Sequence, residues 1–126
     1  MKTIPNISNA EWTIMKIIWQ KKEATANDVI DSLEDEVSWK PKTIMTMLKR
    51  LVDKGALRYE KQGRAYVYSA LLDESECVRA ESRSFLQRVF GGSLKPMLAN
   101  LFDDYDLSDE EIEELKRILD QKSRSV

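Results

Sequence analysis

The chain has 126 residues, of which 42% are hydrophobic and 33% charged, with four glycines and three prolines. This composition describes one ordered domain, or a small domain with an appended helical element, and excludes a disordered or collagen-like chain. There is no histidine and one cysteine, Cys77, which excludes a His-assisted nucleophile and His-containing zinc sites. We therefore expect no enzyme, no cofactor and no metal site, and the single thiol favours a reducing, cytoplasmic setting.

Charge is distributed unevenly along the chain. The formal net charge is −2, yet residues 38 to 66 carry 8 basic and 2 acidic side chains, whereas residues 73 to 126 carry 8 basic and 13 acidic ones. A surface that binds a polyanion is therefore expected in the first of these segments. No stretch approaches the roughly 20 apolar residues of a membrane span, so we expect no membrane insertion.

Two capping signals open the chain. Ser8 and Glu11 form an S-x-x-E capping box, which predicts a helix over residues 9 to 21. Thr25 and Asp28 repeat this pattern ahead of a short second helix of about ten residues. The first helix is expected to bury the side chains that recur at helical spacing: Trp12, Met15, Ile18 and Trp19.

The stretch KPKTIMTMLKRLVDKG, residues 40 to 55, predicts a third helix. Pro41 suits the first helical position, and Gly55 suits the left-handed residue that ends a helix. The apolar side chains follow the spacing of a buried stripe: Ile44, Met47, Leu48, Leu51 and Val52. The opposite face is polar and mostly basic, and it begins at the helix N-terminus, where backbone N–H groups attract phosphate.

The periodicity then changes to that of strands. Residues alternate in character over 57 to 61, and a second strand-like run covers 65 to 68, with a turn near Gly63 between them. This pattern predicts a β-hairpin. Three helices followed by a two-stranded ribbon is the order of a winged helix-turn-helix. The ribbon tip carries Lys61 and Arg64, so it is basic as well.

From Asp73 onward the chain is predicted to form three amphipathic helices, separated by Gly91-Gly92 and by the polar stretch DDYD at residues 103 to 106. Short helices of this kind cannot form much of a core alone, so we expect them to pair with the same helices of a second subunit. The residues expected at this dimer interface are Phe85, Leu86, Val89, Leu94, Leu98, Leu101, Phe102, Ile112, Leu115 and Leu119. The predicted fold is mostly α with a small β-ribbon: a winged helix-turn-helix DNA-binding domain over residues 1 to 72 and a helical dimerisation domain over residues 73 to 126.

The basic helix and ribbon admit two interpretations, of which an ordinary solvated surface with scattered lysines is the plainer. Binding of double-stranded DNA is favoured because the helix order, the basic face, the helix dipole and the basic ribbon tip agree. Thr43 and Thr46 can reach phosphate or a thymine methyl group, and Arg50 can reach the DNA backbone or a guanine edge. The residues predicted to contact DNA are Lys40, Lys42, Thr43, Met45, Thr46, Lys49, Arg50, Lys61 and Arg64.

Several segments together resemble the BlaI/MecI-type penicillinase repressors. They are ISNAEWTIMKIIW at residues 7 to 19, the stretch at 40 to 55, the run from Gly63 through Tyr68, FLQRVFGGSLKPMLANLFDDYDLS at 85 to 108, and EIEELKRIL at 111 to 119. The resemblance implies a homodimeric winged-helix repressor on palindromic operator DNA upstream of β-lactamase or related genes. It also implies that the third helix enters the major groove, with Lys42, Thr43, Thr46 and Arg50 facing the DNA.

The resemblance further implies a way to relieve repression. In such repressors a membrane sensor protease cuts an Asn-Phe bond in the dimerisation region, and the matching position here is Asn100-Leu101, with leucine in place of the aromatic residue. Two other departures lie at the third helix. Lys40 stands where these repressors tend to carry a capping Ser, and Met45 stands where some relatives have a polar or basic side chain, so a different operator preference is expected.

Two other functions stay open on the sequence. A small-molecule-responsive winged-helix regulator would need a ligand pocket between its two parts. A protein-interaction adaptor would use the basic face to dock an acidic partner. An enzyme is the least favoured class, because no set of base, nucleophile and metal ligands can be assembled from this composition.

Overall fold

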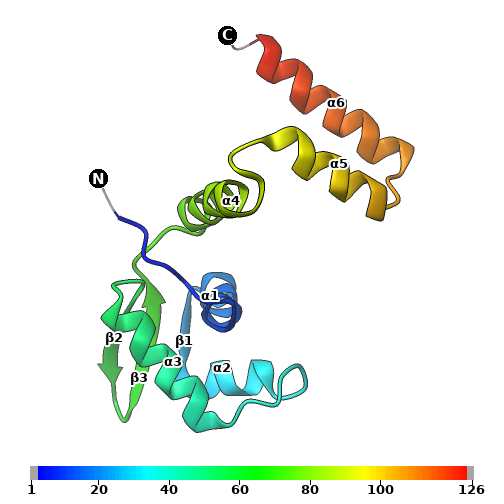
Figure 1. Cartoon of the computed structure of the whole chain (residues 1–126). Helices are drawn as coiled ribbons and strands as arrows, with labels where there is room; N and C mark the ends of the chain where they lie inside the picture. The colour runs from blue at the N-terminus through cyan, green and yellow to red at the C-terminus, as the bar shows by residue number, and fades with distance from the viewer. Residues whose placement is uncertain (1–2, 125–126) are drawn as a thin grey trace. The chain divides into compact units, whose positions relative to one another are not determined.

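The computed structural model describes residues 3 to 124. The chain divides into two units, Met1–Glu81 and Ser82–Val126, and the division falls within one helix (Figure 1). The elements follow in the order α1 (Asn9–Lys21), β1 (Glu23–Thr25), α2 (Ala26–Leu33), α3 (Pro41–Asp53), β2 (Leu57–Gln62), β3 (Ala65–Ala70), α4 (Glu74–Phe90), α5 (Leu94–Asp104) and α6 (Asp109–Arg124). The predicted fold class is confirmed. The predicted domains, 1 to 72 and 73 to 126, concern what each part does, and they stay a prediction.

Helix α1 begins where the capping box predicts, and it covers the predicted residues 9 to 21. The Glu11 N–H donates to Ser8 Oγ over 3.2 Å, and the Ser8 N–H donates to Glu11 Oε1 over 2.8 Å. The buried face is rotated from the predicted one. The buried residues of α1 are Glu11, Ile14, Met15 and Ile18. Both tryptophans of the predicted stripe are only half-buried, because they lie at the edge of the buried face rather than at its centre.

The sheet has three antiparallel strands in the order β1-β3-β2. The two-residue loop of the predicted hairpin is Gly63-Arg64, and Gly63 has a φ of +64°, as the first loop position of a type II′ turn requires. Strand β1 is a third strand that the sequence pattern does not predict. It is only three residues long, with Ala24 opposite Tyr68, too short for alternation to be recognised.

The core of the first unit is assembled from all three helices and the base of the sheet. Helix α3 contributes Ile44, Met47, Leu48 and Leu51, in agreement with the predicted stripe. Leu72 and Cys77 also belong to this core. The Trp19 indole N–H donates to the Leu72 carbonyl over 3.0 Å and so ties α1 to the chain that leaves the sheet.

An ion pair of the first unit has a buried carboxylate. The Glu11 side chain is buried, and its Oε1 is 2.6 Å from the Lys54 ammonium, which also donates to the Asn6 carbonyl over 2.9 Å. Burial raises the pKa of Glu11, but the hydrogen bonds from Lys54 and Ser8 outweigh it and hold the pKa below its ordinary value. Because Lys54 is the C-cap of α3, the pair fixes the end of α3 to the start of α1.

The second unit comprises the last part of α4 with α5 and α6. Ser108 and Glu111 form another capping box at the start of α6, with Ser108 Oγ accepting from the Glu111 N–H over 3.1 Å. Within residues 82 to 124, no side chain is buried. Taken alone, this unit therefore has no core of its own. No helix within residues 3 to 124 is both long and apolar enough to span a bilayer.

Glu11→Gln tests the ion pair. The amide keeps an oxygen for Ser8 but loses the charge that faces Lys54, so we expect the free energy of unfolding at neutral pH to fall by about 1–3 kcal/mol. The folded pKa of Glu11 is lowered, so its contribution is present above the ordinary value of 4.5 and is lost as the pH falls through the folded pKa. The difference between wild type and variant should therefore shrink in acid.

Urea unfolding followed by tryptophan fluorescence measures this difference, because all three tryptophans lie in the first unit. The matched control is Glu113→Gln, which removes an exposed carboxylate 3.4 Å from Lys116 and should leave the curve unchanged. Equal losses in both variants would contradict a special role for the buried pair.

Candidate nucleic-acid interface

Helix α3 holds six of the predicted contact residues on one outward face. The apolar stripe turns into the core, and the helical period then leaves the other side in solvent. This face is exposed along its whole length and consists of Lys42, Thr43, Met45, Thr46, Lys49 and Arg50. The Thr46 hydroxyl donates to the Lys42 carbonyl over 3.0 Å, so its proton is already used within the helix.

The N-terminus of α3 is positively charged. Lys40 is the N-cap and makes no side-chain cap hydrogen bond, while Pro41 fills the first helical position and has no N–H to satisfy. The N–H groups of Thr43 and Ile44 donate to the Lys40 carbonyl over 2.9 and 3.3 Å. Lys40 and Lys42 add full charges to the positive end of the helix dipole, which makes this terminus attractive to phosphate.

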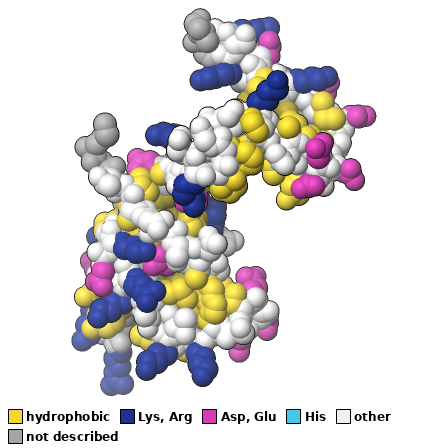
Figure 2. Space-filling view, viewed as in Figure 1, with side chains coloured by type: hydrophobic (Ala, Val, Ile, Leu, Met, Phe, Trp, Pro, Cys, Tyr) yellow, Lys and Arg dark blue, Asp and Glu magenta, His cyan; other side chains and the backbone are white. Residues whose placement is uncertain are grey.

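The hairpin tip carries the other two predicted contact residues. Lys61 is in β2 and Arg64 is in the turn, and both are exposed. In Figure 2, Lys and Arg side chains gather over the region where Figure 1 draws α3 and the β2-β3 hairpin. The structure therefore brings all nine predicted contact residues onto α3, its N-cap and the adjoining hairpin.

An apolar groove runs between α3 and the hairpin, and the sequence reasoning missed it. Its volume is about 780 Å³, and its lining residues are Pro41, Lys42, Met45, Thr46, Lys49, Val52, Asp53, Tyr59, Tyr66 and Tyr68. The ring of Tyr59 is 5.2 Å from that of Tyr66 and 6.1 Å from that of Tyr68. Burial raises the pKa of Tyr68, and the neighbouring tyrosines raise it further. The sequence signal for this groove is the alternation of side chains along β2 and β3, because it places these three tyrosines on one face of the hairpin.

Two basic residues of the segment 38 to 66 are engaged with other side chains of the protein. Lys54 is engaged with Glu11 at the far end of α3, and the Arg58 Nε donates to Ser69 Oγ over 3.1 Å across the hairpin. The charge count of the sequence therefore overstates the cation density that a ligand would meet. The other basic side chains of the segment lie at the N-cap and on the outward face of α3, and at the hairpin tip.

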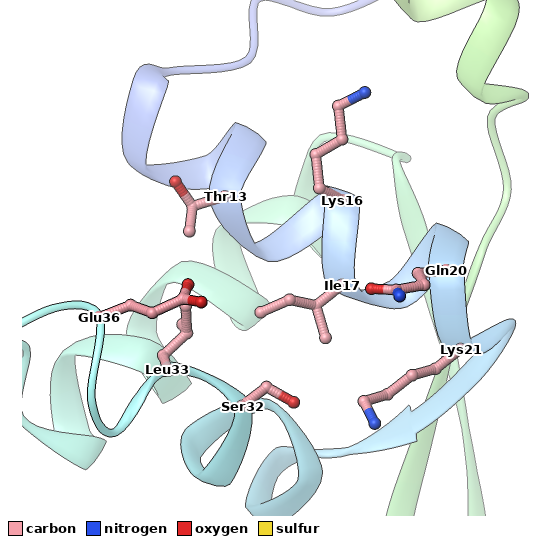
Figure 3. A pocket seen from close by; sticks show the side chains of 8 residues that line it. All are labelled: Thr13, Lys16, Ile17, Gln20, Lys21, Ser32, Leu33 and Glu36. Carbon is pink, nitrogen blue, oxygen red and sulfur yellow. The ribbon is translucent and has the colours of Figure 1, made fainter.

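A second groove, of about 670 Å³, lies between α1 and α2 (Figure 3). Lys16, on its rim, points away from the other lining side chains and forms an ion pair with Glu74 at 2.6 Å. The hydroxyls of Thr13 and Ser32 donate to backbone carbonyls of their own helices. Within residues 3 to 124 the buried side-chain polar atoms without a partner, Glu11 Oε2 and Trp12 Nε1, do not line it. This groove is a weaker candidate than the face of α3.

The residues predicted at the dimer interface lie in the second unit, on α4, α5 and α6. Leu86, Leu98 and Leu115 are half-buried. The other seven, Phe85, Val89, Leu94, Leu101, Phe102, Ile112 and Leu119, are exposed to solvent in the single chain. An apolar surface of this extent on a small unit is typical of a protein-protein interface.

Asn100 and Leu101, the predicted cleavage position, lie inside α5 and are both exposed. The Asn100 side-chain amide donates to the Pro96 carbonyl over 2.8 Å. The bond between them is thus reachable from solvent but held in helical conformation. Among residues 3 to 124, no group of three or more Cys, Asp and Glu side chains is arranged to hold a metal ion.

The sequence pattern of the family described as penicillinase repressor matches residues 7 to 121. The chain belongs to the penicillinase repressor family. The penicillinase repressor of Bacillus licheniformis is 46% identical over 121 residues, which cover 96% of this chain and 94% of that protein. The methicillin resistance regulatory protein MecI of Staphylococcus aureus strain N315 is 40% identical over 92% of this chain and 94% of its own length.

Two solved structures are similar to part of the chain. The DNA-binding domain of the repressor BlaI is 50% identical with a TM-score of 0.54, and the match covers 60% of this chain and 93% of that one. The monomeric form of Bacillus licheniformis BlaI in complex with the blaP half-operator is also 50% identical, with a TM-score of 0.53 over the same shares. The penicillinase repressor family thus consists of transcriptional repressors with a DNA-binding winged helix, and not of enzymes.

Gly63→Ala tests how the hairpin tip is held. A Cβ at a φ of +64° is strained, although no neighbouring atom lies within 4 Å of it, so we expect a cost of about 1–2 kcal/mol confined to the hairpin. Amide hydrogen exchange should then accelerate in β2 and β3 and not in α1. Gln62→Ala, next to it in the strand, is the control and should exchange as wild type does; equal acceleration in both variants would contradict this account of the turn.

Proposed function

We propose that this protein is a cytoplasmic, dimeric, sequence-specific repressor that binds palindromic operator DNA and controls β-lactamase or related resistance genes. The observation that carries the proposal is the outward face of α3, which combines hydrogen-bonding, apolar and cationic side chains with an N-terminus open to phosphate. The half-operator complex of a relative with 50% identity supports double-stranded DNA as the ligand.

The side chains divide by role along the interface. Lys40 and Lys42, at the positive end of α3, neutralise phosphates and set the register of the helix. Lys61 and Arg64 at the hairpin tip contact the backbone beside the groove. The base-reading positions lie along the outward face of α3: Thr43, Met45, Thr46, Lys49 and Arg50.

Dimerisation supplies the bivalency that a palindrome needs. The second unit has no buried side chain within residues 82 to 124 and exposes apolar residues on three helices. Pairing with a second copy would remove this surface from water at about 25 cal/mol per Å². Two linked reading helices then bind two half-sites far more tightly than either binds one.

Relief of repression would follow cleavage of the Asn100-Leu101 bond by a membrane sensor protease. The cut would remove Leu101, Phe102 and all of α6 from the apolar surface of the second unit. Because proteases act on extended chain, α5 must unwind locally before cleavage.

Selection from a random duplex pool at near-physiological salt tests the reading of DNA, with wild type and Arg50→Ala in parallel. Wild type should enrich a two-fold palindrome, and its affinity should fall steeply as salt is raised. Arg50→Ala should lose about 1–3 kcal/mol of binding and relax the preference at one position of each half-site.

Lys116→Ala is the control, because it removes one exposed cation from α6 without touching α3 or the hairpin; it should enrich the same motif as wild type. If a folded, dimeric wild type enriches no motif, the reading of DNA sequence is refuted. A docking role for the basic face would then be the better account.

A chain that ends at Asn100 tests the dimer and the consequence of cleavage together. It retains the first unit but lacks Leu101, Phe102 and α6. In sedimentation equilibrium we expect it to be a monomer at concentrations where the full chain is a dimer, and its affinity for the selected palindrome should drop by at least about 100-fold. Unchanged tryptophan fluorescence would show that the first unit is intact. A truncated chain that still dimerises would refute this role for the segment after Asn100.

A further inference from the structure

Met45 is an apolar residue on the otherwise polar and basic outward face of α3. It is 52% exposed, and the side chains beside it on the outward face are lysine and threonine. A thioether chain offers no useful hydrogen bond to phosphate or to a polar base edge. An exposed apolar residue in the middle of a polar binding face indicates that the ligand carries an apolar group there.

The groove beside Met45 extends this apolar surface. Met45 lines the groove together with Pro41, Val52 and the tyrosines of the hairpin. Tyr59 and Tyr66 are 53% and 47% exposed, so the wall opposite the helix is also apolar and uncovered. Lys42 and Lys49 line the same groove together with one acidic residue, Asp53. The excess of positive charge favours an occupant that carries negative charge over a neutral or cationic one.

Duplex DNA presents one apolar group on the base edges of its major groove, the C5-methyl of thymine. Met45 is the fifth residue of α3, and the N-terminal part of a recognition helix is the part that reaches base edges. An unbranched, flexible side chain can adapt to a methyl group of slightly variable position. The phosphates that flank such a base would lie within reach of the lysines on the same helix.

We infer that Met45 reads a thymine C5-methyl group, and that this contact gives the operator preference of this protein at one position of each half-site. The inference rests on the proposed function and names the chemical group that the reading face recognises. Thr46 is a weaker candidate for the same role. Its side chain is shorter than that of Met45 and reaches less far from the helix.

Replacement of thymine by deoxyuridine removes only the methyl group and keeps every base pair. The full-length protein is first used to select its palindrome, and each thymine of that duplex is then replaced by deoxyuridine, one symmetric pair at a time. At one position we expect the affinity of wild type to fall roughly fourfold for each methyl lost, or roughly 15-fold for the pair. The other thymines serve as internal controls.

Two variants assign the effect to Met45. Met45→Gln has nearly the same length but is polar, so it should bind the thymine and deoxyuridine duplexes equally. Met45→Leu is still apolar and should keep most of the discrimination. Because the side chain is exposed, both variants should keep the melting temperature of wild type.

The outcomes separate this inference from the proposed function. Wild type that binds its palindrome without any sensitivity to methyl loss would overturn the role of Met45 and leave the repressor function standing. The same holds if Met45→Gln stays as sensitive as wild type, because the methyl would then contact another residue, such as Thr43. Failure to enrich any palindrome would refute the proposed function, and the inference with it.

Discussion

The placement of α3 in the core decides what this protein can present to a ligand. Ile44, Leu48 and Leu51 are almost completely buried, and a helix anchored along one stripe has no freedom to rotate about its axis. Any rotation would expose these side chains, at roughly 1.5–3 kcal/mol for each large aliphatic residue. The polar and basic face is therefore fixed outward by the hydrophobic effect, and no interaction of its own is needed to keep it there.

The two ends of α3 differ in how they are held. At its C-terminus, Lys54 meets the buried carboxylate of Glu11, which also caps α1, so one side chain links the two helices. At its N-terminus no side chain closes the helix, and cationic residues surround the open end. The C-terminus of α3 is thus fixed by an ion pair, whereas its N-terminus, where a phosphate of the proposed ligand would bind, has no side-chain cap.

The two units differ in how complete they are. The first has a closed core, whereas residues 82 to 124 include no buried side chain and expose apolar residues on each of their three helices. A unit that lacks a core of its own offers the surface on which a second copy would pack in the proposed dimer.

The sequence by itself determined the boundaries of α1 and α3 and the outward set of residues on α3. The Ser8 capping box, Pro41, Gly55 and the period of the apolar stripe are local signals that translate directly into backbone geometry. The hairpin and its basic tip followed from alternation and Gly63 for the same reason. The end of α5 was predicted wrongly, because the helix continues to Asp104, within the expected polar loop. Only the tertiary structure decided the rest. Three features depend on residues that are distant in the chain: the pairing of strand β1, the ion pair of Glu11 with Lys54, and the groove between Met45 and the tyrosines. A local sequence pattern does not indicate which distant residues will be in contact.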